Sequence, residues 1–184
     1  MSHRVPEIRL RPVTEADLDM FRRFVTEPGL IGLDWSGFTD PKAVQRRFDT
    51  DSYLGADDGR LIVDVAAAGE EPGWQRVGLV SYLKRYHGTR SFSWEIGIAL
   101  LPEWRGQGIG WRAQAMFCSY LFENTSVQRI EAATHEDNAA EQRSLEKAGF
   151  TLEGVLRAAE FRADKWRAGY LYSRLRTDPD PLAD

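Results

Sequence analysis

The first fifty residues change from alternating to helical spacing of hydrophobic positions. Residues 7–13, EIRLRPV, alternate between apolar and polar side chains, which predicts a strand. Residues 14–25 instead predict a helix, capped by Thr14, whose apolar face is formed by Leu18, Phe21, Phe24 and Val25. A second short helix is expected over residues 41–49, because Pro41 suits the first turn of a helix.

From residue 60 onward, β-branched and aromatic runs separated by turn residues predict strands. Three successive antiparallel strands are expected, at RLIVDVAAAG (60–69), RVGLVSYLKRY (76–86) and RSFSWEIGIAL (90–100). The pattern then predicts a helix over 109–123, a strand over 129–135, a helix over 139–148 ended by Gly149, and strands over 151–162 and 168–176. The last two strands are expected to form a hairpin through the connection ADKWRAG.

The order of these elements predicts an α+β fold. A meander of strands comes first, a strand–helix–strand–helix segment follows, and a hairpin closes the chain. A chain of 184 residues is long enough to bury a substantial core, so we expect one domain over residues 1–176. The remaining residues, 177–184, read TDPDPLAD and are expected to be a disordered tail.

Composition and charge narrow the classes of protein. The formal net charge of −4 argues against a strongly electrostatic interaction with nucleic acid. No apolar run approaches the roughly 20 residues needed to span a bilayer, and the N-terminal segment has no apolar leader, so neither membrane association nor secretion is expected. The single cysteine, Cys118, excludes an internal disulfide and fits a cytoplasmic location; we expect it to be a small buried core residue.

The segment PEWRGQGIGWRAQAM, residues 102–116, places three glycines directly before a predicted helix. Gly106, Gly108 and Gly110 oppose helix formation, so they need another explanation. The N-terminus of a helix offers unpaired N–H groups and the positive end of the helix dipole, and glycines let a phosphate approach them. Arg105 adds a positive charge beside this segment. The alternative is that the glycines only permit a sharp turn or close helix packing.

Two well-known phosphate-binding motifs do not fit the segment. A P-loop requires Lys and Ser or Thr after its last glycine, whereas Gly110 is followed by Trp111. A dinucleotide-binding fingerprint would match at Gly108, Gly110 and Ala113, but it belongs to an early parallel strand–helix unit, and here the preceding strands are expected to be antiparallel.

The pattern Arg105-x-x-Gly108-x-Gly110 resembles the acetyl-CoA motif of the GNAT N-acetyltransferases. The strands WEIGIAL and RIEAATH and the residue Asn138 stand around it at the matching places, and LEKAGFTLEGVL (145–156) is similar to the ribosomal-protein N-terminal acetyltransferase branch, of the RimJ/RimL type. The resemblance covers about residues 7–176. It implies the GNAT fold, a mixed, mostly antiparallel sheet of about seven strands flanked by about four helices, with strands 4 and 5 splayed.

The resemblance also implies a cofactor site. Acetyl-CoA is the cosubstrate of the family, and no metal is expected. Leu100 matches the splayed strand whose backbone binds the pantetheine arm and the thioester, and the turn matches the site of the pyrophosphate. The residues expected to bind the cofactor are Leu100, Arg105, Gly106, Gln107, Gly108, Ile109, Gly110 and Asn138.

The sequence departs from the family where a proton donor is common. The usual Asn-x-x-Ser pattern reads Asn138-Ala-Ala-Glu141 here, and Leu145 replaces a frequent tyrosine. Asn138 and Glu141 also have the spacing of a capping box, a structural interpretation that competes with a catalytic Glu141. Glu160 in LRAAEF matches a glutamate proposed as general base in this branch, and Glu95, beside the thioester, is the second candidate. Either carboxylate could instead be an ordinary strand residue paired with an arginine.

The resemblance therefore implies direct transfer of an acetyl group from acetyl-CoA to a primary amine. The acceptor could be a protein N-terminus, a polyamine, or an amine-bearing metabolite or antibiotic, and a homodimer is possible. The alternative hypothesis is a CoA-binding sensor or interaction module without turnover, which the missing serine and tyrosine support.

Overall fold

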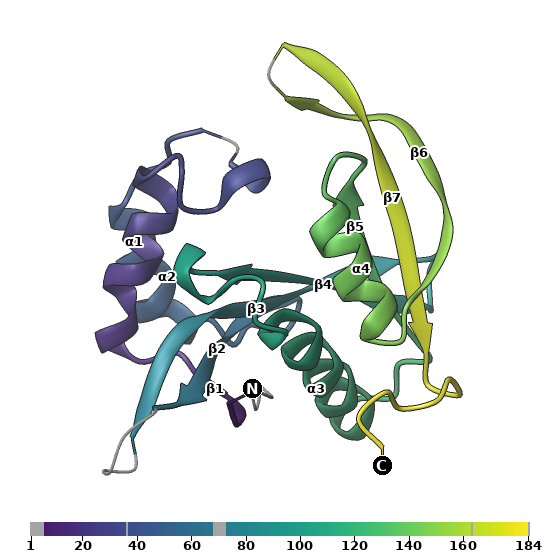
Figure 1. Cartoon of the computed structure of the whole chain (residues 1–184), viewed down its shortest axis with the longest axis horizontal. Coiled ribbons are helices and arrows are strands. Elements are labelled where there is room, and N and C mark those ends of the chain that lie inside the picture. Colours follow the sequence, from purple (N-terminus) through teal and green to yellow (C-terminus); the bar gives the residue numbers. More distant parts are fainter. Residues whose placement is uncertain (1–5, 36, 68–72, 163, 184) are drawn as a thin grey trace, which may run out of the picture.

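The computed structural model describes residues 6–35, 37–67, 73–162 and 164–183. A seven-stranded sheet with the order β1-β2-β3-β4-β5-β7-β6 forms its centre (Figure 1). Among the described strands, β4 and β5 pair in parallel and the other neighbours pair in antiparallel fashion, as the resemblance implied. The strands are β1 (Ile8–Pro12), β2 (Asp58–Ala66), β3 (Trp74–Tyr86), β4 (Phe92–Leu100), β5 (Arg129–His135), β6 (Thr151–Arg162) and β7 (Lys165–Leu175).

In the described residues, four α-helices cover the two faces of the sheet: α1 (Leu18–Thr26), α2 (Lys42–Asp51), α3 (Ile109–Asn124) and α4 (Ala139–Lys147). Side chains alternate between the faces along each strand. In β2, Leu61 and Val63 therefore join a core with residues of α3 and α4, whereas Ile62 joins a second core with residues of α1 and α2. The predicted α+β architecture is confirmed by this arrangement.

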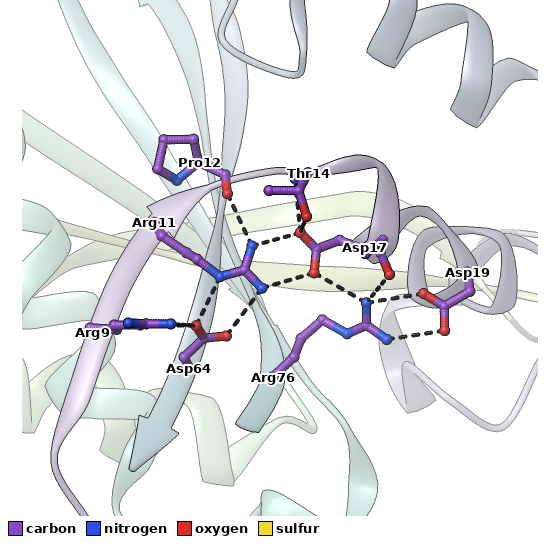
Figure 2. A network of polar contacts seen from close by, with 9 residues as sticks. Arg9, Arg11, Pro12, Thr14, Asp17, Asp19, Asp64 and Arg76 are labelled. Carbon is purple, nitrogen blue, oxygen red and sulfur yellow. Dashed lines mark hydrogen bonds and ion pairs between the residues drawn. The ribbon is translucent and has the colours of Figure 1, made fainter. Parts of the chain in front are cut away.

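A buried ion-pair network joins the N-terminal elements (Figure 2). Asp17 and Asp64 are both nearly inaccessible, and Arg11 bridges them, with its Nη1 2.6 Å from Asp17 Oδ2 and its Nε 2.8 Å from Asp64 Oδ2. Arg76 from β3 approaches Asp17 Oδ1 at 3.1 Å. Burial alone would raise the pKa of Asp17, but hydrogen bonds from Arg11 and Thr14 hold it well below its usual range. The network therefore ties β1, β2 and β3 to the start of α1.

The closing hairpin differs from its prediction in the length of the turn. We expected residues 163–169 to connect the strands, but β7 already begins at Lys165. Phe161 and Trp166 pair across the two strands with ring centroids 5.6 Å apart, a contact that extends the ladder toward the tip. Residue 163, and residues 68–72, which include the end of the predicted strand over 60–69, lie outside the described residues.

The predicted disordered tail also differs from the structure. Asp180 accepts hydrogen bonds from Ser119 Oγ at 3.2 Å and from Arg174 Nη2 at 3.4 Å, and Leu182 packs against the larger core. Asp180 and Leu182 thus hold this segment against α3 and β7. Residue 184, like residues 1–5 of the predicted domain, lies outside the described residues. Within the described part of the chain, no helix combines the length and apolar character needed to cross a bilayer.

Candidate functional site

Strands β4 and β5 diverge soon after they pair. Two residue pairs join them in the described chain, Trp94 with Ile130 and Glu95 with Glu131. Beyond this point β5 continues in register with β7 as far as His135. One edge of β4, over residues 96–100, therefore has no neighbouring strand, which confirms the predicted splay.

A cleft of about 570 Å³ lies beside the free edge of β4. Its walls come from the end of β4, the glycine turn, α4 and the loop that contains Ile31. It is lined by Ile31, Gly32, Leu33, Ile98, Ala99, Leu100, Arg105, Gly106, Gly108, Gly110, Trp111, Asn138, Ala140, Glu141, Arg143, Ser144 and Lys147. Six of the eight residues expected to bind the cofactor are thus brought together at one cleft: Leu100, Arg105, Gly106, Gly108, Gly110 and Asn138.

The other two residues of the expected set direct their side chains elsewhere. Gln107 Nε2 donates a hydrogen bond to the carbonyl of Glu103 at 2.8 Å, and Ile109 is fully buried in the larger core. Any contact of these two residues with a ligand in the cleft would have to involve their backbone groups.

Glycine is favoured at the three positions of the turn for different physical reasons. Gly106 and Gly108 have φ angles of +73° and +77°, in the left-handed region that favours glycine. Gly110 lies in the first turn of α3, and a Cβ at this position would come within 3.3 Å of Ser144 Oγ. Sharp turning and close helix packing are therefore both present. The same geometry leaves the first N–H groups of α3 without helical acceptors beside the cleft.

Arg105 joins the end of β4 to a distant loop. Its Nε donates a hydrogen bond to the carbonyl of Leu100 at 2.9 Å, and its Nη2 donates one to the carbonyl of Leu30. The sequence led us to expect a cation beside an anion site, and Arg105 does line the cleft. Its role in holding Leu30 was not predicted, because no local sequence signal connects residues that are 75 positions apart.

A polar cluster links α3 to α4 next to Gly110. Asn138 caps α4 by accepting a hydrogen bond from the Glu141 N–H at 3.3 Å, which is one half of the expected capping box, whereas the Asn138 N–H donates to the carbonyl of His135 at 2.9 Å. The Glu141 carboxylate accepts a hydrogen bond from Nε2 of the fully buried Gln114, and Gln114 Oε1 accepts one from Ser144 Oγ at 2.8 Å. The sequence analysis did not single out Gln114. The one signal for it was a polar residue on the apolar face of a predicted helix.

Both candidate general bases are paired with arginines. Glu160 Oε2 lies 2.6 Å from Arg162 Nε, and Arg162 Nη1 also donates to the carbonyl of Trp35 at 3.2 Å. Glu95 accepts hydrogen bonds from Arg85 on both carboxylate oxygens, at 2.7 and 3.0 Å. Neither glutamate is among the residues that line the cleft.

The sequence did not single out a third carboxylate, Glu131. It is buried and lies opposite Glu95 at the point where the strands diverge. Arg129 Nε and His87 Nε2 approach its Oε1 at 2.6 and 2.8 Å. Burial raises the pKa of Glu131, but hydrogen bonds from Arg129 and Ser93 outweigh it and leave the pKa below its usual value.

Cys118 is fully buried in the larger core, as predicted, and burial raises the pKa of its thiol to about 12. Within the described residues, no group of three or more His, Cys, Asp or Glu side chains is arranged to hold a metal ion.

Comparison with known proteins identifies relatives by sequence. The family model "Acetyltransferase (GNAT) domain" matches residues 7–151. Two curated proteins of Bacillus subtilis (strain 168) match shorter segments. The uncharacterized N-acetyltransferase YoaA is 40% identical over 63 residues, 34% of this chain and 36% of that protein. The probable N-acetyltransferase YjcK is 35% identical over 81 residues, 44% of each. The chain thus spans less than half the length of these curated relatives.

Solved structures resemble the whole fold. Spermidine N-acetyltransferase from Vibrio cholerae, in complex with CoA and spermine, has a TM-score of 0.78 at 18% identity, over 96% of this chain and 98% of that one. RimL, a ribosomal L7/L12 α-N-protein acetyltransferase in complex with coenzyme A, has a TM-score of 0.71 at 18% identity, over 91% and 93%. At this identity the likeness establishes the fold alone. The family model covers most of the chain, and it is this match that shows that the chain belongs to the GNAT acetyltransferase domain family.

Proposed function

We propose that the protein transfers an acetyl group from acetyl-CoA to a primary amine by direct attack. The observation that carries this proposal is a single cleft lined by both the glycine turn before α3 and the unpaired end of β4. A phosphate site and a free strand edge in one cleft suit a long ligand with a diphosphate at its middle and a thioester at one end. Family membership supports the same activity.

The turn residues fit a diphosphate in a specific way. A Cβ at Gly106 would meet no protein atom within 4 Å, so the turn leaves open space at this position. Backbone N–H groups between Gly106 and Gly110 bind the diphosphate, helped by the positive end of the α3 dipole. Asn138 and the backbone of Leu100, which line the same cleft, are assigned to the arm that leads to the thiol. That a spermidine acetyltransferase and RimL of this fold are named as CoA complexes supports the choice of ligand.

Acetyl-CoA supplies an activated thioester. The chain contributes those alternate N–H groups of β4, over residues 96–100, that face away from β3; they have no β5 partner and can donate to a developing oxyanion. A thiol has a pKa of roughly 8.5, so the departing thiolate needs little acid assistance near neutral pH. Leu145, where relatives often have tyrosine, is fully buried and donates no proton. The absence of a strong acid at this position is therefore compatible with turnover.

Deprotonation of the amine is the more demanding step, since primary amines have pKa values of roughly 8 to 10. We assign the role of general base to Glu160 as the first candidate and to Glu95 as the second. Arg162 occupies one oxygen of Glu160 among the described contacts, whereas Arg85 occupies both oxygens of Glu95. Glu95 also lies three residues before the first cleft-lining residue of β4, Ile98, or about 10 Å along an extended strand. A proton from the cleft would reach it only through water.

The acceptor classes that we propose are a polyamine, a protein N-terminus and an amine-bearing metabolite or antibiotic. Structural neighbours carry names of the first two kinds, spermidine N-acetyltransferase and RimL, at similar identity. The RimJ/RimL branch is favoured by the segment 145–156 alone. The cytoplasmic location and the single domain over residues 1–176 remain predictions from the sequence.

A homodimer through the edge strand β6 is part of the proposal. Leu152, Val155, Phe161 and Trp166 are large exposed apolar side chains on the β6–β7 hairpin, which extends beyond the rest of the sheet (Figure 1). An exposed apolar edge strand is prone to pair with another chain. Val155→Lys should shift a dimer to monomer in light scattering; a monomeric wild-type protein would contradict this part.

The proposed activity is tested by release of free thiol from acetyl-CoA in the presence of a panel of amines. The panel contains spermidine, spermine, peptides with a free N-terminus and an aminoglycoside. Thiol release that depends on one class supports acetyl transfer and names the acceptor class. Tight binding of CoA in calorimetry with no turnover on any amine would favour the sensor hypothesis. No detectable heat with millimolar CoA would contradict the proposed site.

A further inference from the structure

Helix α4 presents two cations to the cleft that the proposed function does not use. Arg143 and Lys147 both line the cleft and are exposed. They lie four residues apart, on one face of the helix and about 6 Å along its axis. Within the described part of the chain, neither makes an ion pair with a carboxylate. Like charges at this spacing repel each other, so the arrangement is slightly unfavourable until an anion lies beside them.

The position of these cations follows from the packing of α4 against α3. Ser144, which lies between them in sequence, contacts the position where a Cβ of Gly110 would stand. The cations therefore lie beside the glycine turn. Asn138 marks the other end of α4, and Lys147 is nine residues further along, or about 13 Å on the helix axis. Lys147 thus stands at the end of the cleft remote from Asn138, the residue assigned to the thiol-bearing arm.

The other charged residues that line the cleft leave Arg143 and Lys147 available to bind an anion. Arg105 already donates to two backbone carbonyls. Glu141 is the carboxylate among the lining residues, and its Oε1 accepts a hydrogen bond from Gln114. Glu141 also lies nearer to Asn138 in sequence than either Arg143 or Lys147 does. Positive charge is thus concentrated toward the remote end of the cleft.

We propose that Arg143 and Lys147 bind the 3′-phosphate on the adenosine of CoA and so distinguish CoA from dephospho-CoA. This inference rests on the proposed function. A phosphomonoester carries close to two negative charges at neutral pH, and in CoA it is separated from the diphosphate by one ribose, on the side away from the thiol. The Arg143 guanidinium and the Lys147 ammonium can both donate charge-assisted hydrogen bonds to its oxygens.

The test is calorimetric titration of CoA and dephospho-CoA into the wild-type protein and into the double variant Arg143→Gln/Lys147→Gln. The matched control is Arg90→Gln/Lys165→Gln, which removes the same charge from two exposed cations outside the cleft. We expect the wild-type protein to bind CoA about tenfold more tightly than dephospho-CoA, as two solvent-exposed charge contacts allow. The double variant should lose this preference while it retains its affinity for dephospho-CoA. The control should keep the preference.

Three results would overturn the inference. The wild-type protein could bind both nucleotides equally, the double variant could retain the preference, or it could lose affinity for both nucleotides by the same factor. Each of these leaves the proposed function intact if CoA still binds. Failure of the wild-type protein to bind either nucleotide would instead refute the proposed function and the inference with it. Thermal melts of both double variants check that the fold is kept, as expected for exposed side chains.

Discussion

Gly106 offers a clean perturbation of the proposed diphosphate site. Its φ of +73° lies in the left-handed region, and an added Cβ would have no protein atom within 4 Å. The variant Gly106→Ala therefore introduces backbone strain and a methyl group at the surface of the cleft, but no clash with the protein. Gly88, in the connection between β3 and β4, has a φ of +95° and equally open surroundings, yet it does not line the cleft. Gly88→Ala is the matched control.

The two variants should be alike in stability and different in affinity. An alanine in the left-handed region costs about 1 kcal/mol, which lowers the melting temperature of a chain of this size by roughly 2–4 °C. If Gly106 allows a phosphate oxygen to reach the turn amides, the alanine methyl group of the Gly106→Ala variant should also remove one charge-assisted hydrogen bond. Such a bond contributes about 1.5–3 kcal/mol, or roughly a 10- to 150-fold change in the dissociation constant of CoA.

The assay combines thermal melts with calorimetric titration of CoA for the wild-type protein and both variants. We expect Gly88→Ala to bind CoA as the wild-type protein does, although it melts at a lower temperature. Equal affinities of the two alanine variants would refute the argument, because open space at Gly106 would then have no connection with a bound diphosphate. A large loss of affinity in Gly88→Ala would show that strain alone, transmitted through the fold, explains the effect.

Three further predictions concern the charges and the core. Asp17→Asn should destabilise the protein by about 2 kcal/mol at pH 7, because it removes the buried carboxylate that accepts charge-assisted hydrogen bonds from Arg11 and Arg76, although Arg11 keeps Asp64 as a partner; the pKa of Asp17 is lower in the folded state, so its contribution is present above its unfolded pKa of about 3.9 and is lost as the pH falls toward the folded value, and the difference between the two proteins in urea unfolding should shrink progressively below about pH 4. Cys118, whose pKa is raised to about 12, should react with a thiol reagent only after denaturation, and rapid reaction of the native protein would contradict its burial. Glu160→Gln should lower the rate of acetyl transfer about 100-fold and raise the apparent pKa of the pH–rate profile, whereas Glu95→Gln should have the smaller effect; the reverse order would move the base to Glu95.

Elements with a strong local pattern could be predicted from the sequence. The run RSFSWEIGIAL marks β4 because β-branched and aromatic residues alternate within it, and α3 begins at Ile109, as expected from the glycines before it. The splay of β4 from β5 had no such local signal. It depends on β5 pairing with β7, forty residues later in the chain, and it was expected from the family resemblance alone.

Contacts between distant segments could not be predicted. Arg105 reaches the carbonyl of Leu30 over 75 positions of the sequence, and Arg162 reaches the carbonyl of Trp35 over 127 positions. Backbone carbonyls carry no residue-specific signal, so nothing in the sequence marks them as acceptors for an arginine. The ordered segment that ends at Leu182 was missed for a related reason, since its Asp residues read as solvent-exposed charges until their donors are placed beside them.

The structure gives Glu141 a role that accounts for its departure from the family pattern. A serine at this position would be too short to reach across to α3, whereas the glutamate bonds the buried amide of Gln114. The amide is then oriented with its oxygen toward Ser144, whose Oγ lies beside Gly110. The three side chains together fix the separation of the two helices at the glycine turn. We propose that the substitution changes how the cleft is held, so that the missing serine alone does not predict an inactive protein.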